Sequence, residues 1–361
     1  MGNKDWRQFD KILVGAFLIL CLIGSVEIYY STQVAGDSPY LEKHLVRLGL
    51  GMLLFLAVLW VDYRIVLNHV WILYALSVLV LAVVLLIGAE IHGSKSWLRL
   101  GGVTFQPSEL VKLVIILALA KFLADYPERY LRPVTLLVAG LIVLVPTGMI
   151  ILQRDLGTAL TIMPVFIVLI LLAGIRKRVV ALAGVILILL LAGSWFVLRD
   201  YQKERILVLA DPGRDPKGTG YQTIQSVIAI GSGGFTGRGL GEGSQGALGF
   251  LPERHTDFIY AVIGEETGFL GAVLVLLLYG AIFQRGLAIA METSDRMAMY
   301  ASAGIVALYA VHLAINVGMT LGLMPVIGIP LPPLSWGGSS VVTAFMAMGL
   351  LINFRIHRYT V

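Results

Sequence analysis

Long apolar runs, separated by short polar connections, follow one another along nearly the whole chain. A helix needs roughly 20 mostly apolar residues to cross a bilayer, with a range of about 17–25. About ten runs reach that length, so the pattern predicts an all-α polytopic membrane protein with about ten transmembrane helices. The expected spans are Ile12–Tyr30, Leu45–Val61, Val70–Ala89, Ser108–Ala124, Val134–Leu152, Leu156–Gly174, Val179–Leu198, Phe258–Phe283, Met297–Leu321 and Trp336–Asn353.

The composition supports this prediction. Of the 361 residues, 58% are hydrophobic and only 14% are charged, whereas a soluble domain has about 25% charged residues. So much apolar surface cannot be buried in a core of this size, so most of it must face lipid. These figures exclude a soluble enzyme, a disordered protein and a nucleic-acid-binding protein, although the net charge is +5. The single cysteine, Cys21, excludes an intrachain disulfide.

The distribution of Lys and Arg predicts the orientation, because these residues accumulate in cytoplasmic loops. With ten spans, one set of segments holds about 14 basic residues and the short loops of the other set hold about five. Both termini are therefore expected in the cytoplasm. We expect one membrane domain over residues 1–361, with a large extracytoplasmic loop at 199–257 that contains short helices at Lys203–Ala210 and Tyr221–Gly231.

Ionisable residues inside spans are costly and usually functional. The sequence Gln106-Pro107-Ser108-Glu109 opens one span, and Lys112 lies three residues after Glu109, so the two side chains share a helix face and can pair. The pair is either structural or part of a polar wall that lines a cavity open to the outer leaflet. The preceding segment, Gly93–Leu100, is short and amphipathic and is predicted to lie at the membrane interface.

Two further polar segments lie at the same side of the membrane. Gln153-Arg154-Asp155 forms a tight outer turn, which is either simply solvated or offers the Arg154 guanidinium to a phosphate. Asp257 directly precedes an apolar span, where it is either a helix cap or a general base with a raised pKa. His255 is a competing candidate for the base, although the six histidines show no metal-ligand spacing.

The stretch from Asn316 to Ser340 is rich in proline and glycine, which break helices. Non-helical backbone near membrane depth is tolerated only where protein or a wet cavity satisfies it, so the stretch is expected to line a cavity or form a rigid re-entrant loop. Glu265 and Glu266 lie two turns into the preceding span and need partners, either within the bundle or on a helix of another protein.

This proline-rich stretch resembles the signature of the SEDS family (shape, elongation, division and sporulation), whose members include RodA, FtsW and SpoVE. The motifs at 106–109 and 153–157 and the aspartate before a helix at 257 also match, so the resemblance covers nearly the whole chain. The short tails make it most similar to the RodA branch. The signature falls on Asn316, Gly322, Pro325, Gly328, Ser335, Gly337, Gly338, Ser339 and Ser340.

The resemblance implies a peptidoglycan glycosyltransferase that acts in cell elongation and shape maintenance. It would transfer the lipid-linked glycan chain to the C4 hydroxyl of lipid II, an undecaprenyl-pyrophosphate-linked disaccharide pentapeptide. The reaction would proceed with inversion to a β-1,4 link and release undecaprenyl pyrophosphate. The protein would lie among the lipids of the bacterial cytoplasmic membrane, with its active site on the outer face, and would work with a class B penicillin-binding protein.

The resemblance also assigns roles to residues. Asp257 would be the essential catalytic residue, as a base for the hydroxyl or as a metal ligand. Lys112 and Arg154 would supply positive charge to the pyrophosphate, a role that a divalent cation (Mg or Mn) could share, and no organic cofactor is expected. Independently of the resemblance, the burial depth of Glu265 and Glu266 marks their span as the place where a partner helix is expected. The expected substrate-binding residues are Gln106, Ser108, Glu109, Lys112, Arg154, Asp155, Ser335, Gly337, Gly338, Ser339 and Ser340.

Two other functions remain open on the residues alone. A lipid II flippase would also have about ten spans, broken helices and a polar cavity, but it would need charge along the whole crossing route. A non-catalytic scaffold of a cell-wall synthase would tolerate replacement of Asp257.

Overall fold

The computed structural model describes residues 6–33, 39–91, 93–100, 103–126, 130–176, 211–215, 218–243, 250–251 and 253–357, with isolated residues between 178 and 209. Among them, eight helices are long and apolar enough to cross a membrane, which confirms the helical membrane fold. These helices are α1 (Lys11–Gln33), α2 (Pro39–Trp60), α4 (Val70–Ile87), α6 (Pro133–Leu152), α7 (Leu156–Ala173), α13 (Gly268–Glu292), α14 (Arg296–Thr320) and α15 (Gly338–Ile356).

A ninth long helix, α5 (Pro107–Asp125), corresponds to the predicted span Ser108–Ala124. It carries more charged residues than the other eight helices, with Glu109 and Lys112 near its start and Lys121 and Asp125 near its end, and most of its side chains are buried in the bundle. The predicted span Val179–Leu198 lies mostly outside the described residues, so the count of ten is not confirmed. The shorter helices are η1 (Trp6–Gln8), α3 (Tyr63–Asn68), η2 (Pro212–Arg214), α10 (Thr219–Gly233) and α12 (Ile259–Glu266).

The predicted span Phe258–Phe283 is wrong as a single helix. Its backbone breaks between α12 and α13 at Thr267 and Gly268, where Gly268 adopts a φ of +68°. The cause is distant in sequence, because the segment that follows α10 pairs with this break. The Phe269 N–H donates to the Gly234 carbonyl at 2.9 Å, and the Arg238 N–H donates to the Glu265 carbonyl at 3.1 Å.

The loop helices were partly predicted. The expected helix at Tyr221–Gly231 is present as α10, and the one expected at Lys203–Ala210 lies largely outside the described residues.

The segment predicted to lie at the interface, Gly93–Leu100, is a β-strand. Strand β2 (Ser94–Leu100) pairs antiparallel with β1 (Ala89–Ile91) and β3 (Val103–Phe105). The Lys95 ammonium donates to the carbonyls of Leu85 and Leu86 at 2.9 and 3.0 Å, so it satisfies groups that the end of α4 leaves unpaired. The small sheet therefore closes one end of the helix bundle.

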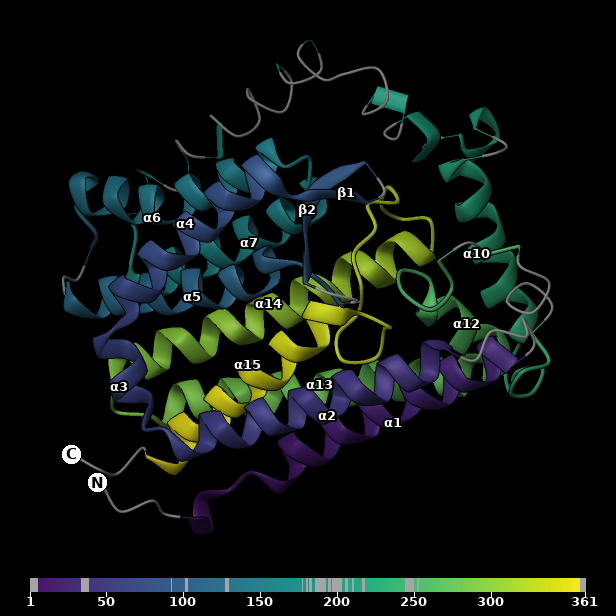
Figure 1. The fold of residues 1–361 in the computed structure, drawn as a ribbon, viewed down its shortest axis with the longest axis horizontal. Coiled ribbons are helices and arrows are strands. Elements are labelled where there is room, and N and C mark those ends of the chain that lie inside the picture. The colour runs from purple at the N-terminus through teal and green to yellow at the C-terminus, as the bar shows by residue number, and fades with distance from the viewer. Residues whose placement is uncertain are drawn as a thin grey trace.

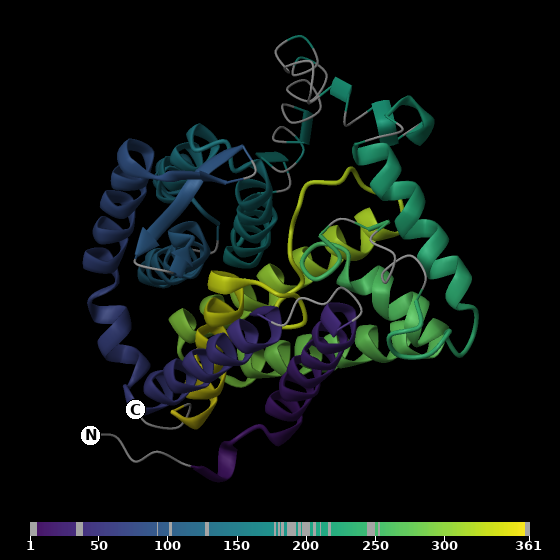
Figure 2. The same cartoon turned by 45° about the vertical axis from the view of Figure 1, so that its right-hand side comes forward.

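The helices α14 and α15 occupy the centre of the molecule (Figure 1). Helix α15 packs most extensively against α2, and α14 packs against α13 on one side and against α5 and α7 on the other. Turning the view by 45° separates the group α4–α7 from α10, which lies beside α12 (Figure 2). The core is therefore built around two helices that flank the proline-rich stretch.

One end of the bundle, which we call the Asp10 end, is held by a buried carboxylate. Asp10 accepts from the Leu13 N–H at 3.0 Å and from Arg285 at 2.8 Å, and it also pairs with Arg355. The start of α1, the later half of α13 and the end of α15 are thereby joined. We call the opposite end, where α5, α7 and α15 begin, the Asp257 end.

Candidate active site

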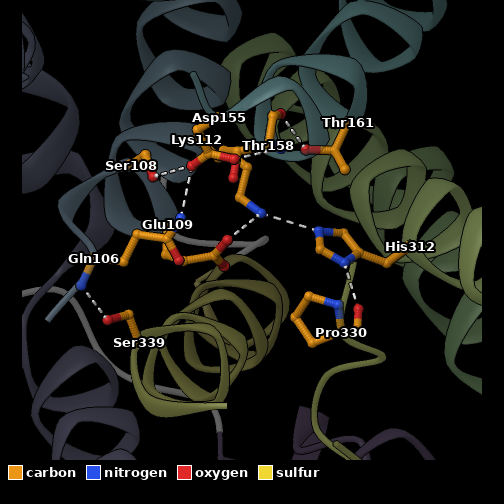
Figure 3. Close-up of polar contacts among 10 residues, drawn as sticks. All are labelled: Gln106, Ser108, Glu109, Lys112, Asp155, Thr158, Thr161, His312, Pro330 and Ser339. Carbon is orange, nitrogen blue, oxygen red and sulfur yellow. Dashed lines mark hydrogen bonds and ion pairs between the residues drawn. The ribbon is translucent and has the colours of Figure 1, made fainter. Parts of the chain in front are cut away.

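The starts of three helices meet at the Asp257 end (Figure 3). Pro107 suits the first turn of α5, where a backbone N–H would have no partner within the helix. The Gln106 backbone N–H donates to the Ser339 hydroxyl of α15 at 2.7 Å, and the Gln106 side-chain amide donates to Asp155 at 2.7 Å. Asp155 also accepts from Ser108 at 3.4 Å and caps α7 through the Thr158 N–H at 3.1 Å. The structure thus brings together side chains that the sequence predicted to bind substrate from three separate motifs.

A buried ionic triad lies one turn further along α5. The Lys112 ammonium lies 2.9 Å from the Glu109 carboxylate and 3.0 Å from Nε2 of His312, as Figure 3 shows. The three residues are 2%, 5% and 3% exposed. They line a small cavity together with Ser340. The pair predicted from the i, i+3 spacing therefore forms, and it borders a cavity.

Asp257 sits in a tight turn that is closed by a single carbonyl. The Glu253 carbonyl oxygen accepts from the N–H groups of Thr256 and Asp257, both at 3.1 Å, and of Phe258 at 3.3 Å. This turn carries the chain directly into α12. The position of Asp257 is therefore fixed by local backbone geometry before any distant contact is made.

The signature stretch then clamps this turn from outside. Each of three successive carbonyl oxygens, those of residues 255, 256 and 257, accepts one hydrogen bond from it. The donors are the Trp336 backbone N–H at 2.7 Å, the Ser335 hydroxyl at 2.6 Å and the Asn316 amide at 2.9 Å. The Asn316 amide also donates to the Ile329 carbonyl at 2.8 Å. The stretch thus holds the backbone of the turn that carries the aspartate.

The Asp257 carboxyl group is half-buried and has an altered acidity. Burial and the nearby negative charge of Glu253 raise its pKa from 3.8 to about 7, against the opposing effect of a hydrogen bond from Thr256. Gly328, with a φ of +79°, faces this group, since a Cβ atom there would lie 3.2 Å from the Asp257 Oδ2 atom. The carboxylate therefore has a pKa suited to a general base at neutral pH.

The competing base, His255, is less suited to that role. Its burial and the charge of Arg254 lower the pKa of the ring to about 4, so it is a weak base at neutral pH. Its Nε2 atom lies 3.4 Å from the Arg254 guanidinium, and its ring contacts Tyr40. Asp257 is accordingly the better candidate.

The two predicted cationic residues differ in availability. The Lys112 ammonium is buried and is engaged by Glu109 and His312. The Arg154 side chain is 64% exposed, and its distance of 3.8 Å from Glu90 makes only a weak surface pair. Arg154 is therefore free to approach an anion at the membrane surface.

Sequence reasoning missed a third cation, Arg47 of α2. Its guanidinium carbon lies 4.2 Å from the centre of the Trp336 ring, a cation–π contact. Its Nη1 atom is buried and has no hydrogen-bond partner among the described residues. A Cβ atom on Gly338 would lie 3.5 Å from the guanidinium, so this glycine lets the start of α15 approach it. The signal in the sequence was a lone arginine inside an expected span.

The prediction that Glu265 and Glu266 bind a partner is not supported by their placement. Their side chains are 0% and 4% exposed. The Gly241 N–H donates to the Glu266 carboxylate at 2.8 Å, and Glu27 of α1 hydrogen-bonds to the same side chain. Glu266 therefore joins the outer loop and α1 to α12 within this chain, and Glu265 is buried beside it.

No three His, Cys, Asp or Glu side chains gather to form a metal-binding group in the described part of the chain. A Mg or Mn site thus remains an expectation from the sequence.

Comparison with known proteins gives consistent matches. The model of the family described as "Cell cycle protein" (FtsW, RodA and SpoVE) matches residues 8–360. The peptidoglycan glycosyltransferase MrdB of Escherichia coli K12 is 34% identical over 366 residues, which cover 99% of this chain and 97% of that protein. Stage V sporulation protein E of Bacillus subtilis is 35% identical, with 97% of each chain covered.

Two solved structures share the fold. A chain from a peptidoglycan synthase complex, described for its coordination of polymerization and crosslinking, matches with a TM-score of 0.85 at 35% identity and covers 99% of this chain and 100% of that one. The Rod shape determining protein RodA of Thermus thermophilus matches with a TM-score of 0.73 at 30% identity and covers 98% of this chain and 99% of that one.

Proposed function

Because this chain belongs to the cell cycle protein family of FtsW, RodA and SpoVE, we propose that it is a peptidoglycan glycosyltransferase that polymerises glycan strands from lipid II in cell elongation. The observation that carries this proposal is the geometry of Asp257. Its carboxyl group has a pKa of about 7, and the backbone of its turn is held at residues 255, 256 and 257 by three donors from the stretch between Asn316 and Ser340. Such a fixed, weakly acidic carboxyl group is what general base catalysis at neutral pH requires.

The reaction needs one displacement. The C4 hydroxyl oxygen of lipid II attacks the anomeric carbon of the lipid-linked glycan chain, and the bond from that carbon to the pyrophosphate oxygen breaks. Asp257 accepts the hydroxyl proton as the new bond forms. Attack from the face opposite the leaving group converts an α-linked donor to a β-1,4 link, so no covalent enzyme intermediate is required.

Departure of the undecaprenyl pyrophosphate requires positively charged groups beside its phosphates. Arg154 is exposed at the Asp257 end, and Arg47 lies beside Gly338 at the start of α15, where backbone N–H groups also favour an anion. By analogy with an oxyanion donor, loss of one such group costs about 2.7–4 kcal/mol of barrier. We assign the pyrophosphate to these two arginines rather than to Lys112, which is already paired with Glu109.

The orientation of the bundle in the membrane follows from the distribution of its arginines. Several arginines, including Arg64, Arg132, Arg285 and Arg355, lie at or near helix ends on the Asp10 side of the bundle. Since basic residues accumulate on the cytoplasmic side, we place the Asp10 end and both termini in the cytoplasm and the Asp257 end outside. A class B penicillin-binding protein is the expected partner in the bacterial cytoplasmic membrane, in line with the synthase complex that this chain resembles.

The flippase alternative is less well supported. A flippase would need polar groups along the whole crossing route, whereas Glu109, Lys112 and Asp257 lie toward one end and the Asp10 cluster ties the helices together at the other. The scaffold alternative makes the different prediction that Asp257 can be replaced without loss of glycan synthesis.

The test is a lipid II polymerisation assay with the purified chain, alone and with a class B penicillin-binding protein. We expect glycan strands from the wild type and a loss of about 10²–10⁴-fold in Asp257→Asn. Asp211→Asn is the matched control, because Asp211 is an exposed acid of the outer loop whose side chain caps η2. Activity of a folded Asp257→Asn protein at the wild-type level would contradict the role of Asp257. An inactive wild type in the presence of partner and Mg²⁺ would favour the flippase, to be tested in vesicles.

A further inference from the structure

His312 of α14 is a buried ionisable residue that the proposed reaction does not use. It lies between the Glu109–Lys112 pair and the signature stretch, with Nε2 at 3.0 Å from the Lys112 ammonium and Nδ1 at 2.9 Å from the Pro330 carbonyl (Figure 3). An ammonium group can only donate, so Nε2 must accept and the ring is neutral. The remaining proton is then on Nδ1, which donates to the Pro330 carbonyl. Both partners together define one tautomer and one ring orientation.

Asn316 lies four residues after His312, so both side chains project from the same face of α14. The Asn316 amide donates to the carbonyls of Ile329 and Asp257, at 2.8 and 2.9 Å. Two consecutive carbonyls of the signature stretch, at 329 and 330, are thus held by consecutive turns of one helix. The chain of contacts runs from Glu109 and Lys112 through His312 and the stretch to the Asp257 backbone.

We propose that His312 is a positioning residue that couples the buried Glu109–Lys112 pair to the placement of Asp257. This inference rests on the proposed glycosyltransferase function. Through the Pro330 carbonyl, the ring makes the position of the catalytic turn depend on the arrangement of α5. The substrate lies in contact with neither ring nitrogen in this scheme, so His312 acts only through its neighbours.

The chemistry of imidazole suits this position. Its two nitrogens lie on opposite sides of a rigid ring, so one can accept from an ammonium while the other donates to a carbonyl. Leucine at this position would leave the Pro330 carbonyl without its donor and Lys112 with one acceptor fewer, and a buried unpaired group is costly. Glutamine keeps one acceptor and one donor on a side chain of similar reach. It is therefore the conservative variant.

The experiment compares His312→Leu, His312→Gln and the wild type in the polymerisation assay, over pH 5.5–9. Tyr309→Phe is the matched control, because it removes another buried hydrogen bond of α14, from the Tyr309 hydroxyl to the Ala344 carbonyl at 2.8 Å. We expect His312→Leu to lower kcat by about 10–100-fold, with KM for lipid II changed by less than about threefold, since misplacement by about 1 Å can cost about 10²-fold. His312→Gln should recover most of the rate, and Tyr309→Phe should behave as the wild type.

The pH profile separates positioning from general stability. In the wild type, the acidic limb of the pH profile, where the rate rises with pH, reports the ionisation of Asp257, which faces Glu253. His312 faces Lys112 and Glu109 instead. Loosening of the catalytic turn in His312→Leu should admit water to Asp257 and move this limb to lower pH. A lower yield of folded protein would change the rate but would leave the limb in place.

A second measurement keeps the inference testable if His312→Leu folds poorly. His312→Ala, which removes both ring contacts with a small side chain, is combined with Lys112→Met in a double-mutant cycle, and residues of one coupled chain should show non-additive effects on kcat. Additive effects, or a folded His312→Leu with wild-type kcat and an unmoved limb, would overturn the role of His312 while the wild type remains active. A wild-type protein that makes no glycan strands in this assay would instead contradict the proposed function itself.

Discussion

At the scale of single residues, Asp257 combines two properties that oppose each other in water. It is acidic enough to lose its proton at neutral pH, yet burial and Glu253 keep its pKa near 7. A carboxylate of ordinary acidity would be ionised but too weak a base to remove a hydroxyl proton effectively. The environment of the turn, rather than the residue type, therefore sets its strength as a base.

The pH dependence of glycan synthesis should show this directly. Because only the ionised carboxylate can accept a proton, the rate should rise with pH and level off above about 7. Glu253→Gln removes the neighbouring negative charge that raises the pKa of Asp257, so the rising limb should move to lower pH. Initial rates from pH 5 to 9 measure the limb, and an unmoved limb in Glu253→Gln would show that Glu253 has no electrostatic effect on the base.

Gly328 and Gly93 form a natural pair for a second test. Both have a φ of +79°, so alanine at either position has a similar backbone cost of about 1–2 kcal/mol. Only at Gly328 would the added Cβ atom approach the Asp257 carboxylate, at 3.2 Å, whereas at Gly93 no atom lies within 4 Å. Gly328→Ala should therefore lower kcat by about tenfold or more, and Gly93→Ala should alter thermal stability alone. Equal kcat values for the two variants would contradict this account.

At the scale of elements, the sequence predicts helices well because their signal is local. Apolar runs of spanning length are decided by consecutive residues, so the central helices α14 and α15 were expected close to their observed bounds. The break between α12 and α13 was not expected, because it depends on a backbone segment about 30 residues earlier that pairs with it. Strand β2 was not predicted for the same reason, because its pairing with β1 and β3 depends on residues outside the strand itself.

The break between α12 and α13 can be tested with one substitution. A Cβ atom on Gly268 would lie 2.3 Å from the Gly237 nitrogen, and the φ of +68° already disfavours other residues. Gly268→Ala should lower the melting temperature of the purified protein strongly, by a loss on the order of 2 kcal/mol or more. Gly280→Ala, in the middle of α13 with no atom within 4 Å, should leave it nearly unchanged. Similar melting curves for both variants would show that the break tolerates a side chain.

At the scale of the whole molecule, the candidate site was predicted through motifs rather than through individual contacts. The resemblance named Gln106, Asp155 and Ser339, which the structure joins by hydrogen bonds at one end of the bundle. It assigned both Arg154 and Lys112 to the substrate, because the exposure of Arg154 and the burial of Lys112 against His312 of α14 arise from packing. Arg47 and His312 were missed, since a single polar residue within an apolar run forms no pattern.

The proposed orientation can be measured by cysteine labelling, because the chain has one cysteine and it is buried. Glu90→Cys and Asp125→Cys replace exposed residues at opposite ends of the bundle. A membrane-impermeant maleimide should label the first variant in intact spheroplasts and the second only after permeabilisation. The reverse pattern would invert the molecule and place Asp257 in the cytoplasm.

The buried Asp10 cluster has a mechanical consequence. It holds α1, α13 and α15 together at the Asp10 end of the bundle. We therefore expect the movements that admit a bulky lipid-linked substrate to occur at the Asp257 end, while the Asp10 end stays closed. An enzyme built in this way can exchange substrate and product without ever opening a continuous aqueous path through the membrane. Its work on the outer surface would leave the proton gradient of the cell intact.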